Sequence, residues 1–284
     1  MNNTFSGLEL QSFSKRVYES ILYQSTFYNF LNMSYIGTLR DTGAPVIEVG
    51  KTKPSSAKVS TRDTVEITRD LNIALTQYER VLVDLTELKL NYAIRVPVAV
   101  SGSDIANAIQ DAADLEDSSI AEEIDKYGYG KLANTTMDEE VWAPTTKEAY
   151  ISLLNSLRAK LFNKKITGNY RLGLGAVEYG NLVSALTSVI KFENVEINNG
   201  VSLGEMGRVY GIDVFEINDN VLEGAIGYFF NPIAVVGDTF FSAFVQTASD
   251  VRLPGYFCLS GNQLFGAEVV RPEAIVRLVE EISA

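Results

Sequence analysis

The sequence predicts an α+β protein, and three observations support this class. Apolar residues recur three and four positions apart in several segments, which is the spacing of an amphipathic helix. Between these segments, apolar and polar residues alternate over short stretches, which is the pattern of a half-buried strand. The chain has 284 residues, 46% of them hydrophobic, and this is enough to bury a substantial core. A folded protein built from both helices and strands is therefore expected.

The first half of the chain predicts a helix, a hairpin and a second helical tract. Helical spacing of apolar residues predicts a helix over residues 8–31. GAPVIEV, from Gly43 to Val49, predicts a turn and a short strand, and an exposed polar loop follows from Lys51 to Ser60. Strand alternation from Val65 to Leu75 and from Val81 to Leu85 then predicts the long strands of a hairpin. Helical spacing returns at Ser103 and continues to Tyr127, where a Gly-Tyr-Gly triplet indicates a break.

The second half predicts helices that alternate with strands. The strongest helical signal is residues 144–162, which combine Pro144, a capping box of Thr145 with Glu148, and a leucine stripe. Strands are predicted at YRLGL, IDVFEI and near GYFFNPIAVV, and a further helix is predicted at VEYGNLVSAL. The tail reads as strands separated by SGNQ, although residues 275–282 are also compatible with a helix.

The composition excludes several kinds of functional site. With no histidine and one cysteine, Cys258, the chain cannot form a Ser-His-Asp or Cys-His site, an ordinary zinc site or an internal disulfide. Its formal net charge of −12 disfavours a surface built to bind nucleic acid. The sequence has no apolar run of about 18 residues and no secretory leader, so a soluble protein made in the cytosol is expected, with no membrane partner. No cofactor or metal is expected.

Two segments partly match nucleotide-binding motifs. GAPVIEVGKT ends in Gly-Lys-Thr as a P-loop does, but Pro45 stands where the first glycine belongs and removes an N–H that phosphate requires. GLGAVEYG lies between a predicted strand and helix, but Glu178 replaces the third glycine of a dinucleotide-binding motif and would face the pyrophosphate. Structural turns are favoured at both places.

An acidic cluster lies in the helical tract after Ser103. Its members are Asp111, Asp114, Glu116, Asp117, Glu122, Glu123 and Asp125. A divalent-ion site is one alternative, but the residue pattern of a calcium-binding loop is missing. A solvated helix face is favoured. Trp142, which follows the segment DEEV, is expected to anchor the core or an interface.

The segment GEMGRVYGIDVFEIND, from Gly204 to Asp219, contains three closely spaced glycines. Gly204, Gly207 and Gly211 match no phosphate-binding pattern, and an alternating apolar strand follows them instead of a helix. We expect the glycines to let the chain bend and to approach a neighbour closely, which makes them candidate interface residues.

This segment and the tail resemble phage major capsid proteins with the HK97-like fold, a superfamily that also includes the encapsulins. The glycine pattern followed by alternating apolar residues resembles a segment late in their axial domain. The tail RLPGYFCLSGNQLFGAEVVRPEAIVRL resembles their closing strands, with an aromatic-Gly pair before a Pro-Glu-Ala ending. The resemblance extends in order over nearly the whole chain.

The resemblance implies a division of the chain into domains. It implies an N-terminal arm (1–48), an extended hairpin or E-loop (49–90), a peripheral domain (91–144 and 248–284) with a spine helix over about residues 103–133, and an axial domain (145–247). An isolated two-stranded ribbon is only marginally stable in water, so we expect the E-loop to pack on another subunit.

The function implied by the resemblance is structural and not enzymatic. The chain is expected to assemble with itself into hexamers and pentamers of an icosahedral capsid that encloses double-stranded DNA without sequence-specific binding. The implied location is the virion, after assembly in the host cytoplasm, with scaffolding, portal and cementing proteins as further partners. An encapsulin-type nanocompartment shell is the first alternative, and a carboxylate-dependent hydrolase is the alternative from another class.

Three lysines of the E-loop, Lys51, Lys53 and Lys58, are further candidate interface residues. Some relatives join an E-loop lysine covalently to an asparagine of the adjacent subunit, beside a glutamate that acts as base. Such a bond requires a lysine made neutral by burial, whereas this loop contains serines and a proline and is expected to be solvated. We therefore expect no covalent mesh. The lysines are expected to contact acidic groups of a neighbour, such as those between Asp111 and Asp125, by electrostatics.

Overall fold

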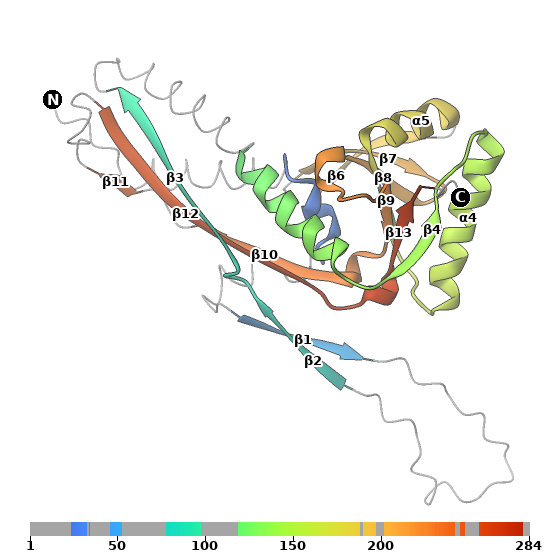
Figure 1. Cartoon of the computed structure of the whole chain (residues 1–284), viewed down its shortest axis with the longest axis horizontal. Coiled ribbons are helices and arrows are strands. Elements are labelled where there is room, and N and C mark those ends of the chain that lie inside the picture. The colour runs from blue at the N-terminus through green and yellow to red at the C-terminus, as the bar shows by residue number, and fades with distance from the viewer. Residues whose placement is uncertain are drawn as a thin grey trace, which may run out of the picture.

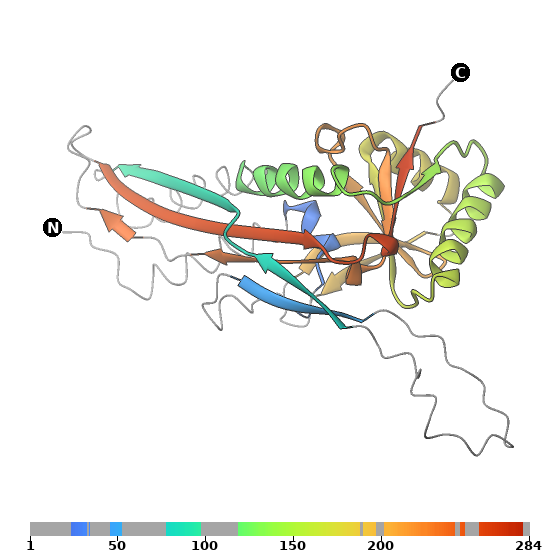
Figure 2. The ribbon, with the colours of Figure 1, turned by 60° about the horizontal axis from the view of Figure 1, so that its bottom comes forward.

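A seven-stranded mixed sheet forms the body of the protein, and a long curved ribbon of strands leaves it on one side (Figures 1 and 2). This arrangement comes from a computed structural model. It describes residues 24–32, 34, 46–52, 78–97, 119–187, 190–196, 202–241, 245–247 and 256–280. Among these residues, no helix is long and apolar enough to cross a membrane.

The seven strands of the body are ordered β4-β13-β9-β5-β8-β7-β6. Their bounds are β4 (Asp138–Val141), β13 (Ile275–Val279), β9 (Gly227–Phe230), β5 (Tyr170–Gly175), β8 (Ile212–Ile217), β7 (Ser202–Val209) and β6 (Lys191–Glu196). The pairs β4–β13 and β5–β8 are parallel, and the other pairs are antiparallel. The central strands β5 and β9 are buried along their whole length, which explains why they lack polar alternation. β13 is a strand, so the helical alternative for residues 275–282 is wrong.

Two α-helices adjoin this sheet, α4 (Lys147–Asn163) and α5 (Ala176–Leu186) (Figure 1). The predicted helix at residues 144–162 is confirmed, with its buried side chains spaced as expected. Its predicted capping box is wrong, because Thr146, one residue later, is the N-cap and accepts a hydrogen bond from the backbone N–H of Ala149. Thr146 still has an extended backbone, so the helix begins after it.

Residues 119–133 form a helix that continues through the Gly-Tyr-Gly triplet, so the predicted break is wrong. The rest of the tract that begins at Ser103 lies outside the described residues. Gly128 occurs within this helix because the ring of Phe27 fills the space that a Cβ atom would need there. The glycine therefore serves packing, at the expense of about 1 kcal/mol of helix propensity.

The segment before this packing site forms the 3₁₀ helix η1 (Thr26–Phe30). It is the described end of the helix predicted over residues 8–31, and residues 8–23 lie outside the described part. Phe27, Tyr28, Phe30 and Leu31 have no exposed surface. The ring of Phe30 contacts the rings of five other aromatic residues, Phe27, Tyr129, Phe215, Tyr228 and Phe230. This short segment is thus a central part of the core.

A second sheet forms the ribbon around the longest strand, β12 (Tyr256–Val269). β3 (Leu88–Pro97) pairs with one edge of β12, and β10 (Val235–Phe241) and β11 (Val245–Thr247) pair with the other. The predicted separation of two strands at SGNQ is wrong, because residues 260–263 continue the ladder with β3. Inside the sheet, the amide N–H of Gln263 donates a hydrogen bond to Thr239 Oγ1 at 2.8 Å, and the Thr239 hydroxyl donates to Leu264 O at 3.1 Å.

β1 (Val46–Thr52) and β2 (Tyr78–Asp84) form an antiparallel pair, so the strands predicted near residues 43–49 and 81–85 are partners. The strand predicted at residues 65–75 lies outside the described residues. Residues 53–77 between the two strands lie outside the described part. One face of the pair is buried in an apolar cluster formed by Ile47, Val49, Val83, Leu85, Val236 and Val270. The opposite face exposes Leu82 and Val46.

β7 and β8 form a second hairpin, closed by Tyr210 and Gly211. Gly204 and Gly207 lie within β7, so the prediction that they form a bend before a strand is wrong. Gly211 has a φ of +78° and does serve the turn.

Candidate assembly surfaces

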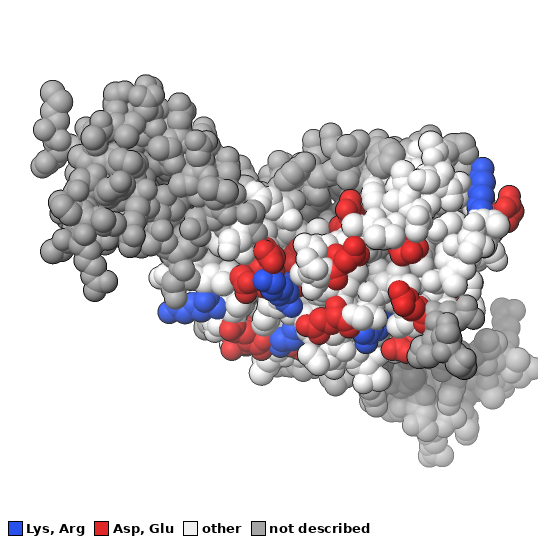
Figure 3. Space-filling model, turned by 45° about the horizontal axis from the view of Figure 1, so that its top comes forward, with Lys and Arg blue, Asp and Glu red and all other residues white. Residues whose placement is uncertain are grey.

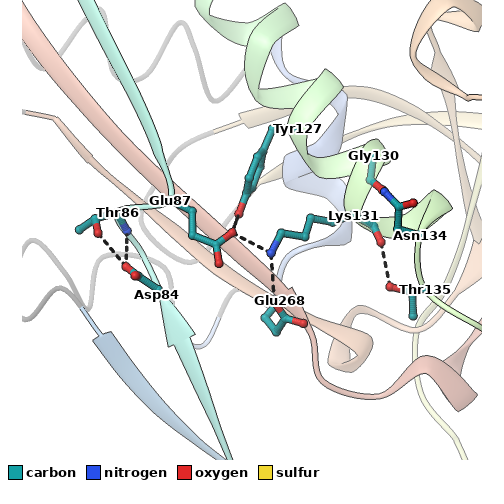
Figure 4. Close-up of polar contacts among 9 residues, drawn as sticks. All are labelled: Asp84, Thr86, Glu87, Tyr127, Gly130, Lys131, Asn134, Thr135 and Glu268. Carbon is teal, nitrogen blue, oxygen red and sulfur yellow. Dashed lines mark hydrogen bonds and ion pairs between the residues drawn. The ribbon is translucent and has the colours of Figure 1, made fainter.

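The hairpin, the ribbon and helix 119–133 meet at one polar cluster, which we call the junction (Figure 4). Lys131 Nζ lies 2.7 Å from Glu87 Oε2, in the turn between β2 and β3, and 3.4 Å from Glu268 Oε2 on β12. The hydroxyl of Tyr127, one helical turn before Lys131, donates a hydrogen bond to the same oxygen of Glu87. One ammonium group therefore connects three elements that are far apart in the sequence.

The charges at the junction reinforce one another. Hydrogen bonds from Lys131 and Tyr127 hold the pKa of Glu87 below its usual value. Partial burial and the bond to Glu87 raise the pKa of Tyr127 to about 12. Partial burial alone would lower the pKa of Lys131, but its acidic partners raise it above the usual value. At neutral pH Lys131 and Glu87 are consequently charged, and Tyr127 is neutral.

A close backbone contact fixes the crossing of β2 over β12. A Cβ atom at residue 266 would collide with the carbonyl oxygen of Asp84, so only glycine fits at this position. The Asp84 side chain accepts hydrogen bonds from the backbone N–H and the hydroxyl of Thr86, each at 2.8 Å. This local turn directs the chain from the hairpin toward the ribbon.

A second polar contact holds the N-terminal segment to helix 119–133. Asp125 is buried and accepts hydrogen bonds from the Ser25 hydroxyl, from the Thr26 N–H and hydroxyl, and from the Phe27 N–H. Burial raises the pKa of Asp125, and these four hydrogen bonds act in the opposite direction. The prediction that the acidic cluster is a solvated face is therefore wrong for Asp125.

Two other members of the acidic cluster are exposed. Glu122 and Glu123 form ion pairs with Lys126 on the same helix, at 2.9 and 3.0 Å. On the face of the molecule shown in Figure 3, Asp and Glu side chains are spread widely, with Lys or Arg beside several of them. Asp111, Asp114, Glu116 and Asp117 lie outside the described residues. No group of residues suited to bind a metal ion occurs in the described ranges.

The interface residues predicted from the sequence do not lie together in the described parts of the chain. Lys51 belongs to β1, and Lys53 and Lys58 lie outside the described residues. Gly207 pairs with residues on both neighbouring strands of the body, and Gly211 lies in the exposed β7–β8 turn. Their part in an interface stays a prediction.

Residues 173–180, which partly match a dinucleotide-binding motif, have two acidic side chains at the N-terminus of their helix. The Asp219 side chain lies against Gly175, the N-cap of α5. Glu178, in the first turn of α5, accepts a hydrogen bond from Trp142 Nε1 at 3.1 Å. Two carboxylates at this helix N-terminus disfavour a phosphate group there. Trp142 is buried against Tyr150, so it anchors the core of this subunit.

A shallow hollow, which we call the α4 groove, lies between α4 and the chain segment that follows β4. Its volume is about 410 Å³. Its lining residues are Val141, Ala143, Pro144, Ala149, Ser152, Leu153 and Ser156, and none of them is charged.

Sequence reasoning missed both the junction and the α4 groove. The junction joins Glu87, Lys131 and Glu268, which have no common sequence pattern, and only the tertiary fold brings them together. The groove had a weak signal, because its helical residues recur at spacings of three and four on α4.

Solved capsid structures share the fold of this chain. A structure from Mycobacterium phage Che8 matches with a TM-score of 0.56 at 14% identity, covering 90% of this chain and 91% of that one. The capsid of cyanophage P-SCSP1u matches with a TM-score of 0.54 at 14% identity over 84% of each chain. A virus-like particle from Pyrococcus furiosus matches with a TM-score of 0.53 at 14% identity, over 94% of this chain and 98% of that one.

No protein-family model and no curated protein matches the chain by sequence. At 14% identity the structural similarities establish the fold alone. They confirm the predicted fold class, a mixed helix and sheet protein of capsid type.

Proposed function

We propose that this chain, which has the HK97-like fold of phage capsid proteins, is the structural subunit of a viral shell. Copies of the chain assemble into hexamers and pentamers that form an icosahedral capsid around double-stranded DNA. Each heterologous contact is repeated around a closed symmetric assembly, so modest contacts sum to a stable particle. The chain performs no catalysis in this role.

The observation that carries this proposal is the two-sided β1–β2 hairpin. Its inner face is buried against Val236 of β10 and Val270, which follows β12. On its outer face, Leu82 and Val46 are 68% and 44% exposed. The strand register places Leu82 opposite Glu48 and Val46 opposite Asp84, so the two apolar side chains are diagonal neighbours. An exposed apolar pair on a two-stranded ribbon favours packing against another copy, because such a ribbon is marginally stable alone.

The domain division implied by the resemblance is part of this proposal. It comprises the N-terminal arm (1–48), the E-loop (49–90), the peripheral domain (91–144 and 248–284) and the axial domain (145–247). Under this division the axial and peripheral domains share a sheet, because β13 of the peripheral domain pairs with β9 of the axial domain. The helix at residues 119–133 is the described part of the proposed spine helix.

The proposed partners are the proteins that assembly of a capsid requires. The chain contacts mainly other copies of itself, and scaffolding, portal and cementing proteins join during assembly in the host cytoplasm. The net charge of −12 suits a container, because an acidic wall does not hold DNA by non-specific attraction while the particle fills.

A nanocompartment shell of the encapsulin type is the second candidate. The match to a virus-like particle from Pyrococcus furiosus covers 98% of that chain, so this fold is compatible with a shell that resembles a virus without being one. Particles isolated from the native source distinguish the two functions. Nucleic acid inside the particles supports a viral capsid, and a protein cargo supports a nanocompartment.

A hydrolase that uses carboxylates has weaker support. Such an enzyme needs two acidic side chains that converge in a cavity, and the α4 groove in the described part of the chain is lined by no acidic residue.

Light scattering and negative-stain microscopy of the purified protein test the main proposal. We expect capsomers, shells or tubes, with or without a scaffolding protein. A monomer of 31.2 kDa at every salt and protein concentration, also with a scaffold present, would contradict it.

A further inference from the structure

Tyr210 occupies an unusual position at the end of the β7–β8 hairpin. Val209 pairs with Ile212, so Tyr210 and Gly211 form a two-residue turn in which both residues have positive φ, +50° and +78°. This is a type I′ turn, which favours Asn, Asp or Gly at its first position because a bulky side chain is strained there. The Tyr210 side chain is 46% exposed. The fold of one subunit therefore gives no reason for a tyrosine here.

The α4 groove offers a rigid, uncharged site on the other flank of the same sheet. Trp142 N–H donates a hydrogen bond to Val279 O at 2.9 Å and so holds the segment that forms one wall. Lys160 of α4 and Lys164, the C-cap residue of this helix, form ion pairs with acidic residues of β4, at 2.9 and 2.7 Å. These ion pairs fix the helix that forms the other wall. The groove thus exists before any partner binds, which lowers the entropic cost of binding.

The chemistry of the groove suits a tyrosine side chain. Apolar atoms of Val141, Pro144 and Leu153 can cover the faces of the ring. Ser152 and Ser156, one helical turn apart, carry hydroxyls that can donate to or accept from a phenol. An aliphatic side chain would leave these hydroxyls without a partner.

The two features are both locally neutral. Next to Tyr210, Asp213 is paired with Arg208, whose Nε lies 2.8 Å from its carboxylate. The groove is lined by no charged residue, and tyrosine is itself uncharged at neutral pH. Two copies with a net charge of −12 repel each other overall, so locally neutral patches are where they can approach closely.

One subunit cannot make this contact with itself. The groove lies at the edge strand β4, and β13, β9 and β5 lie between β4 and β8. Four strand spacings of about 4.8 Å give a separation of about 19 Å, which exceeds the reach of a side chain. Two different patches on opposite flanks of one sheet form a heterologous contact, and repetition of this contact closes a ring.

We propose that Tyr210 of one copy binds in the α4 groove of the next copy around a ring of subunits. This inference rests on the proposed function, because it requires a chain that assembles with itself. It assigns one residue and one groove to a contact within the ring.

Disulfide trapping tests the contact directly. Cys258→Ser first removes the native cysteine, and Tyr210→Cys is then combined with Ser152→Cys. Mild oxidation of assembled particles is expected to join copies into a ladder of multiples of 31.2 kDa that ends at five or six copies. In the control variant, Arg158→Cys replaces Ser152→Cys. Arg158 is exposed on the same helix but does not line the groove, so no ladder is expected.

Each outcome of the trapping experiment is informative. Particles that form without a ladder overturn this inference and leave the proposed function intact. A wild-type chain that never assembles overturns both. Equal ladders from the Arg158→Cys control, or cross-linking by Ser152→Cys alone, show that α4 meets a neighbour in another way, and these results also overturn the inference.

Tyr210→Asn is expected to maintain or raise the stability of the unassembled subunit and to weaken its assembly. Asparagine suits the turn better, so the melting temperature of the unassembled subunit is expected to stay equal or rise by a few degrees. The protein concentration needed for assembly is expected to rise at least tenfold, since an aromatic anchor is lost. Unchanged assembly would refute the proposed contact. A melting temperature lowered by several degrees would refute it as well, because Tyr210 would then support its own fold.

Discussion

At the scale of single residues, glycines and buried polar groups determine how the elements meet. Gly128 accepts the ring of Phe27, and Gly266 accepts the backbone of Asp84. Asp125 receives the donors of η1. These positions are restrictive because each partner is itself fixed by packing or by a strand ladder.

Gly128→Ala tests the packing of the N-terminal segment. Alanine gains about 1 kcal/mol of helix propensity. Its Cβ atom would overlap the Phe27 ring, which is confined by Phe30, Tyr129 and Phe265, so overpacking costs about 1–3 kcal/mol. We expect a net loss of stability, measured as a lower urea midpoint of the unassembled subunit.

Gly130→Ala is the matched control for this substitution. The nearest atom to a Cβ at residue 130 is Glu223 Oε1 at 3.7 Å, which is an ordinary contact. The control is expected to gain up to about 1 kcal/mol from helix propensity. Similar gains for both variants would mean that Phe27 does not restrict residue 128.

Glu87→Gln tests the charge dependence of the junction. The pKa of Glu87 is lowered in the folded protein, so its contribution to stability is complete above the usual value of 4.5 and is lost as the pH falls through the lowered pKa. Between about pH 5 and pH 3, the wild-type protein is expected to lose more unfolding free energy than the variant. Glu122→Gln, at an exposed site, is the control. Equal pH dependence of wild type and Glu87→Gln would exclude this role.

At the scale of elements, the sequence predicted those helices and strands that depend on residues close together in the chain. α4 and β8 follow from the spacing and alternation of apolar residues within a few positions. The break expected at residues 128–130 and the turn expected at residues 260–263 were wrong, because distant partners decide both segments. Composition alone cannot show that Phe27 lies against Gly128 or that β3 pairs along β12.

The same reasoning explains why the junction was not predicted. Glu87, Lys131 and Glu268 each look like ordinary surface charges in the sequence. Their connection depends on the crossing of β2 over β12, which depends in turn on Gly266. The groove on α4 was equally hidden, since its second wall comes from the segment after β4.

Lys131→Met tests whether the junction holds the hairpin to the body. The substitution keeps much of the apolar side chain but removes the ammonium group shared by Glu87 and Glu268, and the two carboxylates then face each other. Amide hydrogen exchange in β1 and β2 is expected to accelerate several-fold, which corresponds to a loss of about 1 kcal/mol in opening free energy.

Lys126→Met is the control on the same helix. Lys126 pairs only with Glu122 and Glu123, which are exposed neighbours one turn away, so the effect is expected to stay below about 0.5 kcal/mol. If both variants changed hairpin exchange equally, the junction would not be the attachment point.

At the scale of the whole molecule, the net charge of −12 makes assembly depend on where positive groups lie. The lysines proposed for the E-loop contact carry positive charge toward acidic groups of a neighbour. Asp125 is buried and cannot be one of those groups, so the exposed glutamates of helix 119–133 are the better partners within the described cluster.

The triple substitution Lys51→Glu, Lys53→Glu, Lys58→Glu tests this contact. Assembly is expected to fail while the monomer stays folded, and wild-type assembly is expected to weaken with added salt. A control with Lys89→Glu, Arg158→Glu and Lys165→Glu makes the same change in net charge elsewhere. Normal shells from the first variant, or equal failure of both, would exclude a specific role for the loop.

The expected absence of a covalent mesh has a simple measurement. Boiled and denatured particles are expected to give a single band near 31.2 kDa. A ladder of higher multiples would mean that a lysine of the loop is buried and reactive after all.

The continuity of β12 also determines how the subunit responds to force. This strand has 14 residues and pairs with β3 along one edge and with β10 and β11 along the other. Ladder hydrogen bonds run perpendicular to the strands, so tension along β12 loads many of them together in shear instead of opening them one by one. The ribbon is therefore stiff along its length, and in the proposed shell an outward pressure would be transmitted along β12 to the body with little stretching.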